Sequence, residues 1–360
     1  MTEMALVGEA AEPSSALHYR FHDLSRISLI GGQFPYLERK WSSWKTQEEG
    51  SDLRLMRGTS LPGEHRRVGA EHCYVPGMYR IRTGRSTFDV SSDSIACDGP
   101  FEEQGLEYGI VFPCINRTIV PKGAFLFYSA ALSFNGRTVL IPSFQSSGKT
   151  SIVLELLGRG ASYIADNDCI LDRKGQCRMY SPMVGIHTHH MAAFPEIRAN
   201  YCGPDGSMRG LRKRVAIMEF EGGLKGGNPL MLKVKDYLDA KSFCLCQIDI
   251  RRLYPGCEVL RSARLTHSFV LCPGSPSLRV RRSDSKEAAE MIAVRAWLRR
   301  LGERKVMSDL AGIPYFQLSD CTSVLEDGLS NTECFRLEYD GVKDRKGIVK
   351  LVDAMLKAME

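Results

Sequence analysis

The segment from Asn135 to Leu171 decides the fold, and it reads NGRTVLIPSFQSSGKTSIVLELLGRGASYIADNDCIL. Its first part, residues 137–141, contains an unbroken apolar run that predicts a short buried strand. Apolar residues then recur at helical spacing between Ile152 and Leu157, and the glycines at 158 and 160 end that helix. A second apolar strand follows at 163–165. The segment therefore predicts an α/β fold built on a strand, a loop, a helix and a strand.

The loop between the first strand and the helix ends in Gly148-Lys149-Thr150. Backbone N–H groups at a helix start attract phosphate, and a glycine lets the backbone approach closely. A lysine here binds β- and γ-phosphates, and the following threonine hydroxyl is placed to bind Mg²⁺. This context favours a phosphate-binding loop over an ordinary strand–turn–helix. The predicted nucleotide-binding residues are Ser143, Gln145, Ser146, Ser147, Gly148, Lys149, Thr150 and Ser151.

An acidic residue, Asp166, follows the second strand directly. A carboxylate in this position can hold a metal ion or accept a proton from an acceptor hydroxyl. Asp168 lies close enough in sequence to share these roles. We therefore predict that Lys149 and Asp166 are catalytic, and that Thr150, Asp166 and Asp168 bind the metal.

Four pieces of this segment resemble a known family: Asn135-Gly136-Arg137, Gly148-Lys149-Thr150, Leu154–Gly160 and Ala165–Asp168. The family is the HPr kinase/phosphorylase catalytic domain with its HPr-kinase-like relatives, which share a fold with phosphoenolpyruvate carboxykinase. The close match is confined to the 135–171 segment. The resemblance implies a P-loop-containing, HPr-kinase/PEP-carboxykinase-like catalytic domain.

The resemblance also implies a function: an ATP- and Mg²⁺-dependent kinase that phosphorylates a hydroxyl of a peptide, a protein or a small metabolite. Three departures make HPr itself an unexpected acceptor. Ser143 replaces the first loop glycine, Asn167 replaces a second aspartate, and Tyr128-Ser129 stands where relatives often carry a histidine. Two alternatives therefore stay open, a nucleotide-binding regulator without catalysis and a carboxykinase-like enzyme. Relatives are often oligomers, so a homo-oligomer is expected by analogy.

Three regions are expected along the chain. Residues 1–25 are predicted to form a flexible N-terminus. In residues 26–120, short apolar pieces alternate with turn residues, which predicts a small β-rich domain. Residues 121–360 are assigned to the catalytic domain. Within them, Asp284 with Glu287 forms a capping-box pattern before one amphipathic helix, and residues 348–356 predict another.

Two further groups are candidate phosphate or substrate contacts. One is the basic cluster Arg209, Arg212 and Arg214, because phosphoryl transfer requires cations beyond the loop lysine. The other is His187, which stands in a run with His189 and His190. A zinc site needs a third ligand, and none occurs at a useful spacing. We therefore interpret these histidines as polar residues near the active cleft and not as a metal site.

The composition fits a cytoplasmic enzyme. Hydrophobic residues make up 43% and charged residues 25% of the 360 residues, which is ordinary for a globular protein. A net charge of +6 suits a site for an anionic nucleotide better than a nucleic-acid binder. No apolar run or basic leader indicates a membrane span or secretion. The acceptor and the phosphate donor (ATP, ADP or pyrophosphate) are not specified by the sequence.

Overall fold

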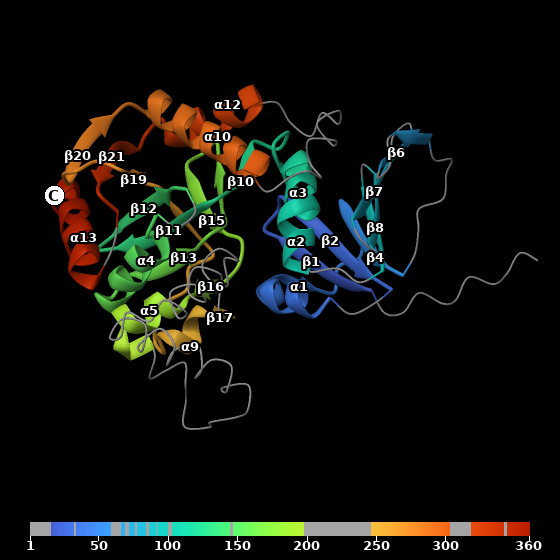
Figure 1. Cartoon of the computed structure of the whole chain (residues 1–360), viewed down its shortest axis with the longest axis horizontal. Coiled ribbons are helices and arrows are strands. Elements are labelled where there is room, and N and C mark those ends of the chain that lie inside the picture. The colour runs from blue at the N-terminus through green and yellow to red at the C-terminus, as the bar shows by residue number, and fades with distance from the viewer. Residues whose placement is uncertain are drawn as a thin grey trace, which may run out of the picture. The chain divides into compact units, whose positions relative to one another are not determined.

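The computed structural model describes most of the chain, and Figure 1 shows its helices and strands. The described residues are 16–31, 34–58, 66–68, 72–75, 78–83, 86–91, 93–99, 103–144, 147–197, 246–302, 318–341 and 344–360. They fall into two compact units, which divide after Lys122.

The first unit contains a nine-stranded sheet in the order β3-β1-β2-β4-β9-β8-β7-β6-β5. The strands are β1 (Leu17–Phe21), β2 (Ser25–Ile30), β3 (Lys45–Thr46), β4 (Leu53–Arg57), β5 (Arg66–Val68), β6 (His72–Val75), β7 (Met78–Thr83), β8 (Ser86–Ser91) and β9 (Ser94–Asp98).

The presence of β1 corrects the expectation of a flexible segment up to residue 25. Leu17, Tyr19 and Phe21 alternate with polar residues, and Tyr19 and Phe21 are buried. Their rings pack edge-on against Trp41, with centroid separations of 5.6 and 5.4 Å. This aromatic packing ties β1 into the core of the unit.

Short helices complete the first unit: α1 (Pro35–Lys40), η1 (Ser42–Trp44), α2 (Glu103–Leu106), the π-helix η2 (Glu107–Val111) and α3 (Phe112–Ile119). A buried ion pair joins two of them, since Lys40 Nζ of α1 lies 2.8 Å from Glu107 Oε2 of η2. The hydroxyl of Tyr36 donates to the same carboxylate oxygen at 2.9 Å. These bonds satisfy charges that would be costly to bury alone.

The second unit is built around a six-stranded sheet in the order β13-β11-β12-β19-β21-β20. Its strands are β11 (Ser129–Phe134), β12 (Arg137–Pro142), β13 (Ser162–Ala165), β19 (His267–Pro273), β20 (Arg279–Ser283) and β21 (Glu333–Tyr339). β12, β19 and β21 are parallel. Asn135 and Gly136, both with positive φ, form the hairpin turn between β11 and β12, as Asn-Gly pairs favour.

Two smaller sheets belong to the same unit. One has the order β10-β14-β15-β18, and the other pairs β16 with β17. The strands are β10 (Ala124–Phe127), β14 (Cys169–Asp172), β15 (Gln176–Met179), β16 (Met183–Ile186), β17 (Cys246–Asp249) and β18 (Ser262–Arg264). The unit is therefore mixed α/β with several mixed sheets.

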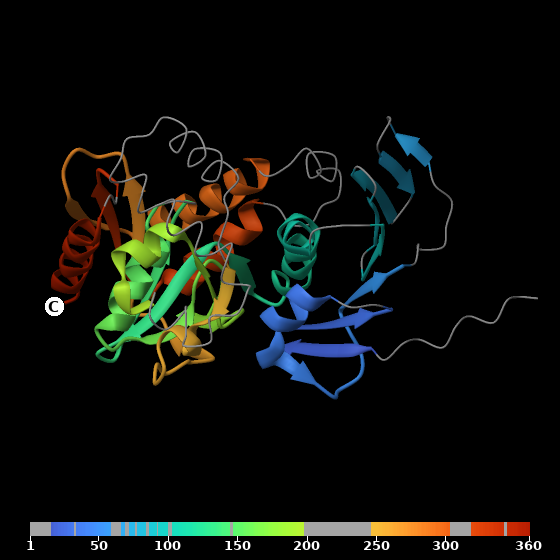
Figure 2. The ribbon, with the colours of Figure 1, turned by 60° about the horizontal axis from the view of Figure 1, so that its bottom comes forward.

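Helices cover both faces of the six-stranded sheet (Figures 1 and 2). Alternate residues of β12, β19 and β21 join the core beneath α4 (Lys149–Gly158), α5 (Thr188–Ala193), α9 (Ile250–Leu253) and α13 (Arg345–Met359). α10 (Ser285–Gly302) lies beside α12 (Leu318–Leu329) on the other face, where Glu287 of α10 pairs with Arg336 of β21 at 3.0 Å. Strand alternation places Arg336 opposite its core neighbours Phe335 and Leu337.

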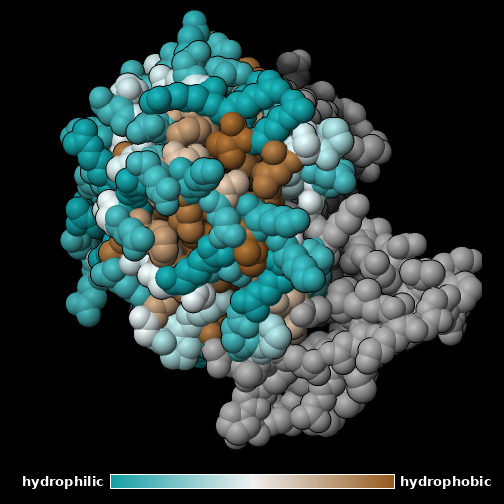
Figure 3. Space-filling view, turned by 90° about the vertical axis from the view of Figure 1, so that its left-hand side faces the viewer, coloured by the Kyte–Doolittle hydropathy of each residue, from teal (hydrophilic) through white to brown (hydrophobic). Residues whose placement is uncertain are grey.

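The face that carries α13 and β20 is mainly hydrophilic, with apolar residues between the charged side chains (Figure 3). Val280 of β20 and Leu356 of α13 are half-buried and pack against the core. Within the described part of the chain, no helix is both long enough and apolar enough to cross a membrane.

Candidate functional site

The loop between β12 and α4 leaves the sheet after Pro142 and ends at Gly148, the residue that precedes α4. Gly148 has φ 84° and ψ 9°, a left-handed conformation that favours glycine. The Ser147 hydroxyl donates to the Phe144 carbonyl at 2.8 Å, and the Tyr339 hydroxyl of β21 donates to the Ser147 carbonyl. The end of the loop is thus bonded both to itself and to the sheet. Gln145 and Ser146 lie outside the described residues.

Lys149 is the first residue of α4, and only 3% of it is exposed. Its Nζ lies 3.2 Å from the centroid of the Tyr128 ring. An ammonium over an aromatic face is stabilised by the ring quadrupole, and more strongly so when it is shielded from water. Tyr128 stands between β10 of the four-stranded sheet and β11 of the six-stranded sheet, so the connection between these two sheets supplies the surface on which this ammonium lies.

A hydroxyl and a carboxylate meet beside the start of α4. Thr150 Oγ1 donates to Asp166, at 3.0 Å from Oδ2 and 3.3 Å from Oδ1. Thr150 is the second residue of α4, and Asp166 follows β13 directly. In the sheet, β11 lies between β13 and β12, the strand that leads into α4, yet the start of α4 comes close enough to the end of β13 to bring these side chains together.

The Asp166 carboxyl is 3% exposed, and burial raises its pKa. The charge of Lys149, the Thr150 hydroxyl and the backbone N–H of Asn167 oppose this shift by favouring the ionised form. The charge of Asp168 adds to the rise in pKa. Burial prevails, so Asp166 holds a proton more readily than an exposed aspartate.

Asn167 has φ 69°, a left-handed conformation in which asparagine is several-fold enriched. Its side-chain amide donates to Asp166 Oδ2 at 3.4 Å, and its carbonyl accepts from the Ser129 N–H at 3.2 Å. Asn167 is thus a turn residue whose side-chain N–H group donates to the Asp166 carboxylate. Asp168 follows and is 2% exposed.

These oxygens fit Mg²⁺ in kind, since a threonine hydroxyl and carboxylates are the hard ligands that this ion takes. Mg²⁺ usually keeps several waters and binds one or two carboxylates with substrate phosphates. Accordingly, Thr150 and Asp166 would hold it, with Asp168 nearby. Within the described ranges, no three His, Cys, Asp or Glu side chains are grouped to hold a metal ion by themselves.

The other predicted residues separate into three sets. Ser143 and Ser151 are buried at the two ends of the loop region, 4% and 3% exposed. The candidates Arg209, Arg212 and Arg214 lie outside the described residues. His187 lies between β16 and α5, and β16 belongs to the two-stranded sheet rather than to the sheet that carries the loop.

The three histidines at the start of α5 form a compact group. The His189 and His190 rings are 4.1 Å apart, and the His187 and His189 rings are 5.4 Å apart. His190 Nδ1 accepts a hydrogen bond from the His187 N–H at 3.1 Å. Burial, aided by the two neighbouring histidines, holds the pKa of His190 well below its ordinary value. His190 therefore stays neutral and serves as an acceptor that caps α5.

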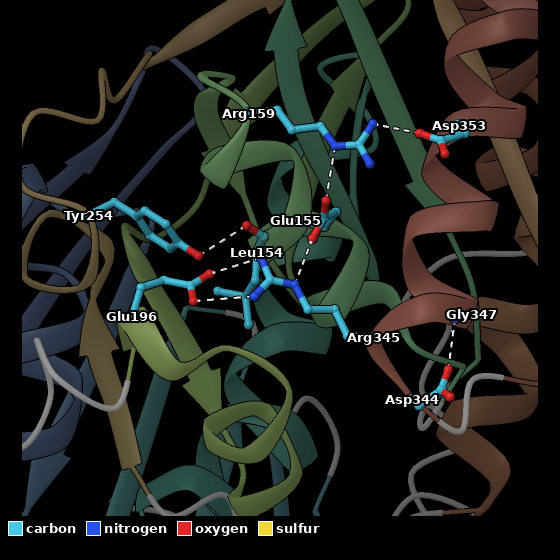
Figure 4. Close-up of polar contacts among 9 residues, drawn as sticks. All are labelled: Leu154, Glu155, Arg159, Glu196, Tyr254, Asp344, Arg345, Gly347 and Asp353. Atoms are coloured by element: carbon cyan, nitrogen blue, oxygen red, sulfur yellow. Dashed lines mark hydrogen bonds and ion pairs between the residues drawn. The ribbon is translucent and has the colours of Figure 1, made fainter.

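A network of charges ties the outer side of α4 to α13 (Figure 4). Glu155 of α4 is bonded by Arg159 at 3.0 Å and by Arg345 at 3.4 Å. Arg159 also pairs with Asp353 of α13 at 2.7 Å, and Arg345 reaches Glu196 at 3.3 Å. The helix that begins with Lys149 is thus held by both hydrophobic packing and ion pairs.

Three residues near the loop were not among the predicted site residues: Tyr128, Arg295 and Tyr339. The structure places the ring of Tyr128 against the Lys149 ammonium. Arg295 of α10 lies over Phe144, with its guanidinium carbon 5.0 Å from the ring centroid. Arg295 and Tyr339 come from elements far along the chain, so no local sequence pattern indicates them.

Comparison with known proteins finds a solved structure of the HPr(Ser) kinase/phosphatase from Coxiella burnetii. The two are similar with a TM-score of 0.30 and 11% sequence identity, over 65% of this chain and 97% of the other. No protein-family model matches the chain, and no curated protein matches it.

Proposed function

We propose that this protein is a Mg²⁺-dependent kinase that transfers the terminal phosphoryl group of ATP to a hydroxyl group. The acceptor is a serine of a peptide or protein, or a small metabolite, other than HPr. The observation that carries the proposal is the contact of Thr150 with Asp166 at 3.0 Å, beside the buried Lys149. A hydroxyl, a carboxylate and an ammonium are the groups that hold a nucleotide phosphate and its metal.

In this proposal Lys149 binds phosphate, Thr150 holds the metal, and Asp166 contributes to both metal binding and proton transfer. Lys149 and the first N–H groups of α4 bind the β- and γ-phosphates, because they carry positive charge at a helix start. Mg²⁺, when bound by Thr150 and Asp166, would neutralise charge on the phosphates. Asp166 accepts the proton of the acceptor hydroxyl, and its raised pKa suits a general base better than an exposed aspartate does.

A second function, nucleotide binding without transfer, is favoured by Asn167. Its amide occupies a place where the resembling family usually has a carboxylate, and it donates to Asp166 rather than offering a ligand. A regulator of this kind would bind ATP and leave it intact.

Calorimetry with Mg-ATP tests whether the loop binds nucleotide. We expect the wild type to bind and Lys149→Ala to bind at least about tenfold more weakly, since a hydrogen bond to a charged group is typically worth about 1.5–3 kcal/mol. Lys350→Ala is the matched control, because Lys350 is an exposed lysine of α13. Equal affinity in wild type and Lys149→Ala would rule out this loop as the nucleotide site.

Transfer is tested separately with labelled ATP and a panel of serine peptides and hydroxylated metabolites. Transfer to any acceptor that is lost in Lys149→Ala supports the kinase. Tight ATP binding without transfer or hydrolysis across the panel would favour the non-catalytic regulator.

A further inference from the structure

A small cavity lies between the β12–α4 loop and α10. Its volume is about 10 Å³, which is room for one water-sized group. Its walls are Tyr128, Pro142, Ser143, Phe144, Ile292, Arg295 and Ala296. The cavity therefore joins the predicted nucleotide loop to a helix that begins well over a hundred residues later in the sequence.

Two of the residues that line this cavity carry buried polar atoms with no hydrogen-bond partner among the described residues. They are Ser143 Oγ and Arg295 Nη1. Ser143 is 4% exposed, so its hydroxyl has little access to bulk water. A buried donor that lacks an acceptor is costly, and two donors at one cavity indicate that a group with an acceptor oxygen belongs there.

The remainder of the Arg295 guanidinium is already fixed. Its Nη2 donates to Cys272 Sγ at 3.1 Å, and its Cζ lies 5.0 Å from the Phe144 ring centroid. These contacts hold the planar fork in place, so Nη1 would lose little conformational freedom when it binds an oxygen.

Tyr128 connects this cavity to the predicted phosphate site. Its ring forms one wall of the cavity, and Lys149 Nζ lies 3.2 Å from the centroid of the same ring. The ammonium of Lys149 and the guanidinium of Arg295 are thus neighbours of one tyrosine. A phosphate bound by Lys149 has oxygens of the charge and size that the cavity accepts.

We propose that Arg295, together with Ser143, binds an oxygen of the terminal phosphate of the bound nucleotide. The proposal rests on the proposed function and adds a second cation to it. Charge develops on the phosphoryl oxygens during transfer, and fixed cations beyond the loop lysine stabilise it.

The test compares Mg-ATP with Mg-ADP, because only ATP has the terminal phosphate. By calorimetry, Arg295→Ala should weaken ATP binding by about 10- to 100-fold, the usual range for a charged hydrogen bond, and ADP binding by less than about threefold. Arg282→Ala is the control. Its side chain lies on β20, is 74% exposed and pairs with Glu333 at 3.2 Å, so both affinities should stay unchanged.

Two further variants distinguish phosphate binding from support of the loop. Arg295→Lys keeps the charge and should retain part of the ATP affinity, whereas Ser143→Ala should lose about tenfold or more, because its hydroxyl would also donate to a charged oxygen. Equal losses for ATP and ADP in Arg295→Ala would show that Arg295 only supports the loop.

Unchanged affinities in both Arg295→Ala and Ser143→Ala would show that the cavity holds water alone. Either result overturns this assignment and leaves the proposed function standing. A wild type that binds neither nucleotide would instead remove the proposed function, and this assignment with it.

Discussion

Two buried lysines, one in each unit, have different surroundings. Lys40 lies 2.8 Å from Glu107, donates to the Tyr108 hydroxyl at 3.2 Å, and is 2% exposed. Lys149 is 3% exposed, but its ammonium rests on an aromatic ring, beside an aspartate that is bonded by a threonine. The first arrangement is a closed structural pair between helices. The second follows a left-handed glycine at a helix start, which is where the proposed function places a phosphate.

The largest expected effect is the loss of phosphoryl transfer when Asp166, beside Lys149, is replaced. Asp166→Asn keeps the size of the side chain but loses its charge and basicity, so phosphoryl transfer should fall by about 10²- to 10⁴-fold. ATP affinity should change much less, because Lys149 and the N–H groups of α4 remain. Steady-state kinetics together with calorimetry measure both quantities. A parallel loss of Mg-ATP binding and turnover would instead identify Asp166 as the main metal ligand.

For Lys40 we expect the opposite pattern, a loss of stability without a loss of ATP binding. Lys40→Met leaves the Glu107 carboxylate buried without its cation, which should lower the free energy of unfolding by about 3–5 kcal/mol. ATP affinity should not change. Urea unfolding followed by tryptophan fluorescence checks the first expectation, and calorimetry checks the second.

Two controls sharpen the Lys40 result. The double variant Lys40→Met/Glu107→Leu removes both charges and should recover most of the stability. Arg54→Ala breaks a pair with Asp93 whose side chains are about half exposed, and it should cost less than about 1 kcal/mol. If Lys40→Met is no more destabilising than Arg54→Ala, the view of Lys40 as a structural anchor is wrong.

The buried side chain of His190 differs from both lysines, because burial keeps its imidazole neutral in the folded protein. Below its ordinary pKa of 6.5 the unfolded chain binds a proton on this histidine, whereas the folded chain does not because its pKa is lowered. Stability should therefore fall as the pH drops below 6.5, by up to about 1.4 kcal/mol per pH unit.

The matched variant for this pH dependence is His190→Asn, whose side-chain oxygen can still accept from the His187 N–H. It should lose less stability between pH 7 and pH 5 than the wild type does. Urea unfolding at several pH values measures the difference. Identical slopes for the two proteins would mean that His190 does not remain neutral.

Local patterns predicted the elements around the loop well. The expected strands at 137–141 and 163–165 are β12 and β13, and the expected helix is part of α4, because short apolar runs and helical periodicity carry this information. The cap at Asp284 is also confirmed, since its carboxylate accepts from the Glu287 N–H at 2.7 Å.

Contacts between distant segments were not predictable in this way. Nothing near Ser147 indicates Tyr339, which is 192 residues away, and nothing near Phe144 indicates Arg295. Likewise, the sequence does not reveal that β11 lies between β12 and β13. The strand at Leu17–Phe21 was missed for another reason: its alternating pattern is present, but it is short and carries a histidine and an arginine.

The ion pairs between α4 and α13 have a consequence for biosynthesis. Arg159 and Asp353 are 194 residues apart, so at about 5–20 residues per second a ribosome needs roughly 10–40 s to make the second after the first. During that interval the helix that begins with Lys149 lacks the neighbour that covers its outer side. Nascent chains should therefore acquire protease resistance around Lys149 late, after residues 345–359 have emerged.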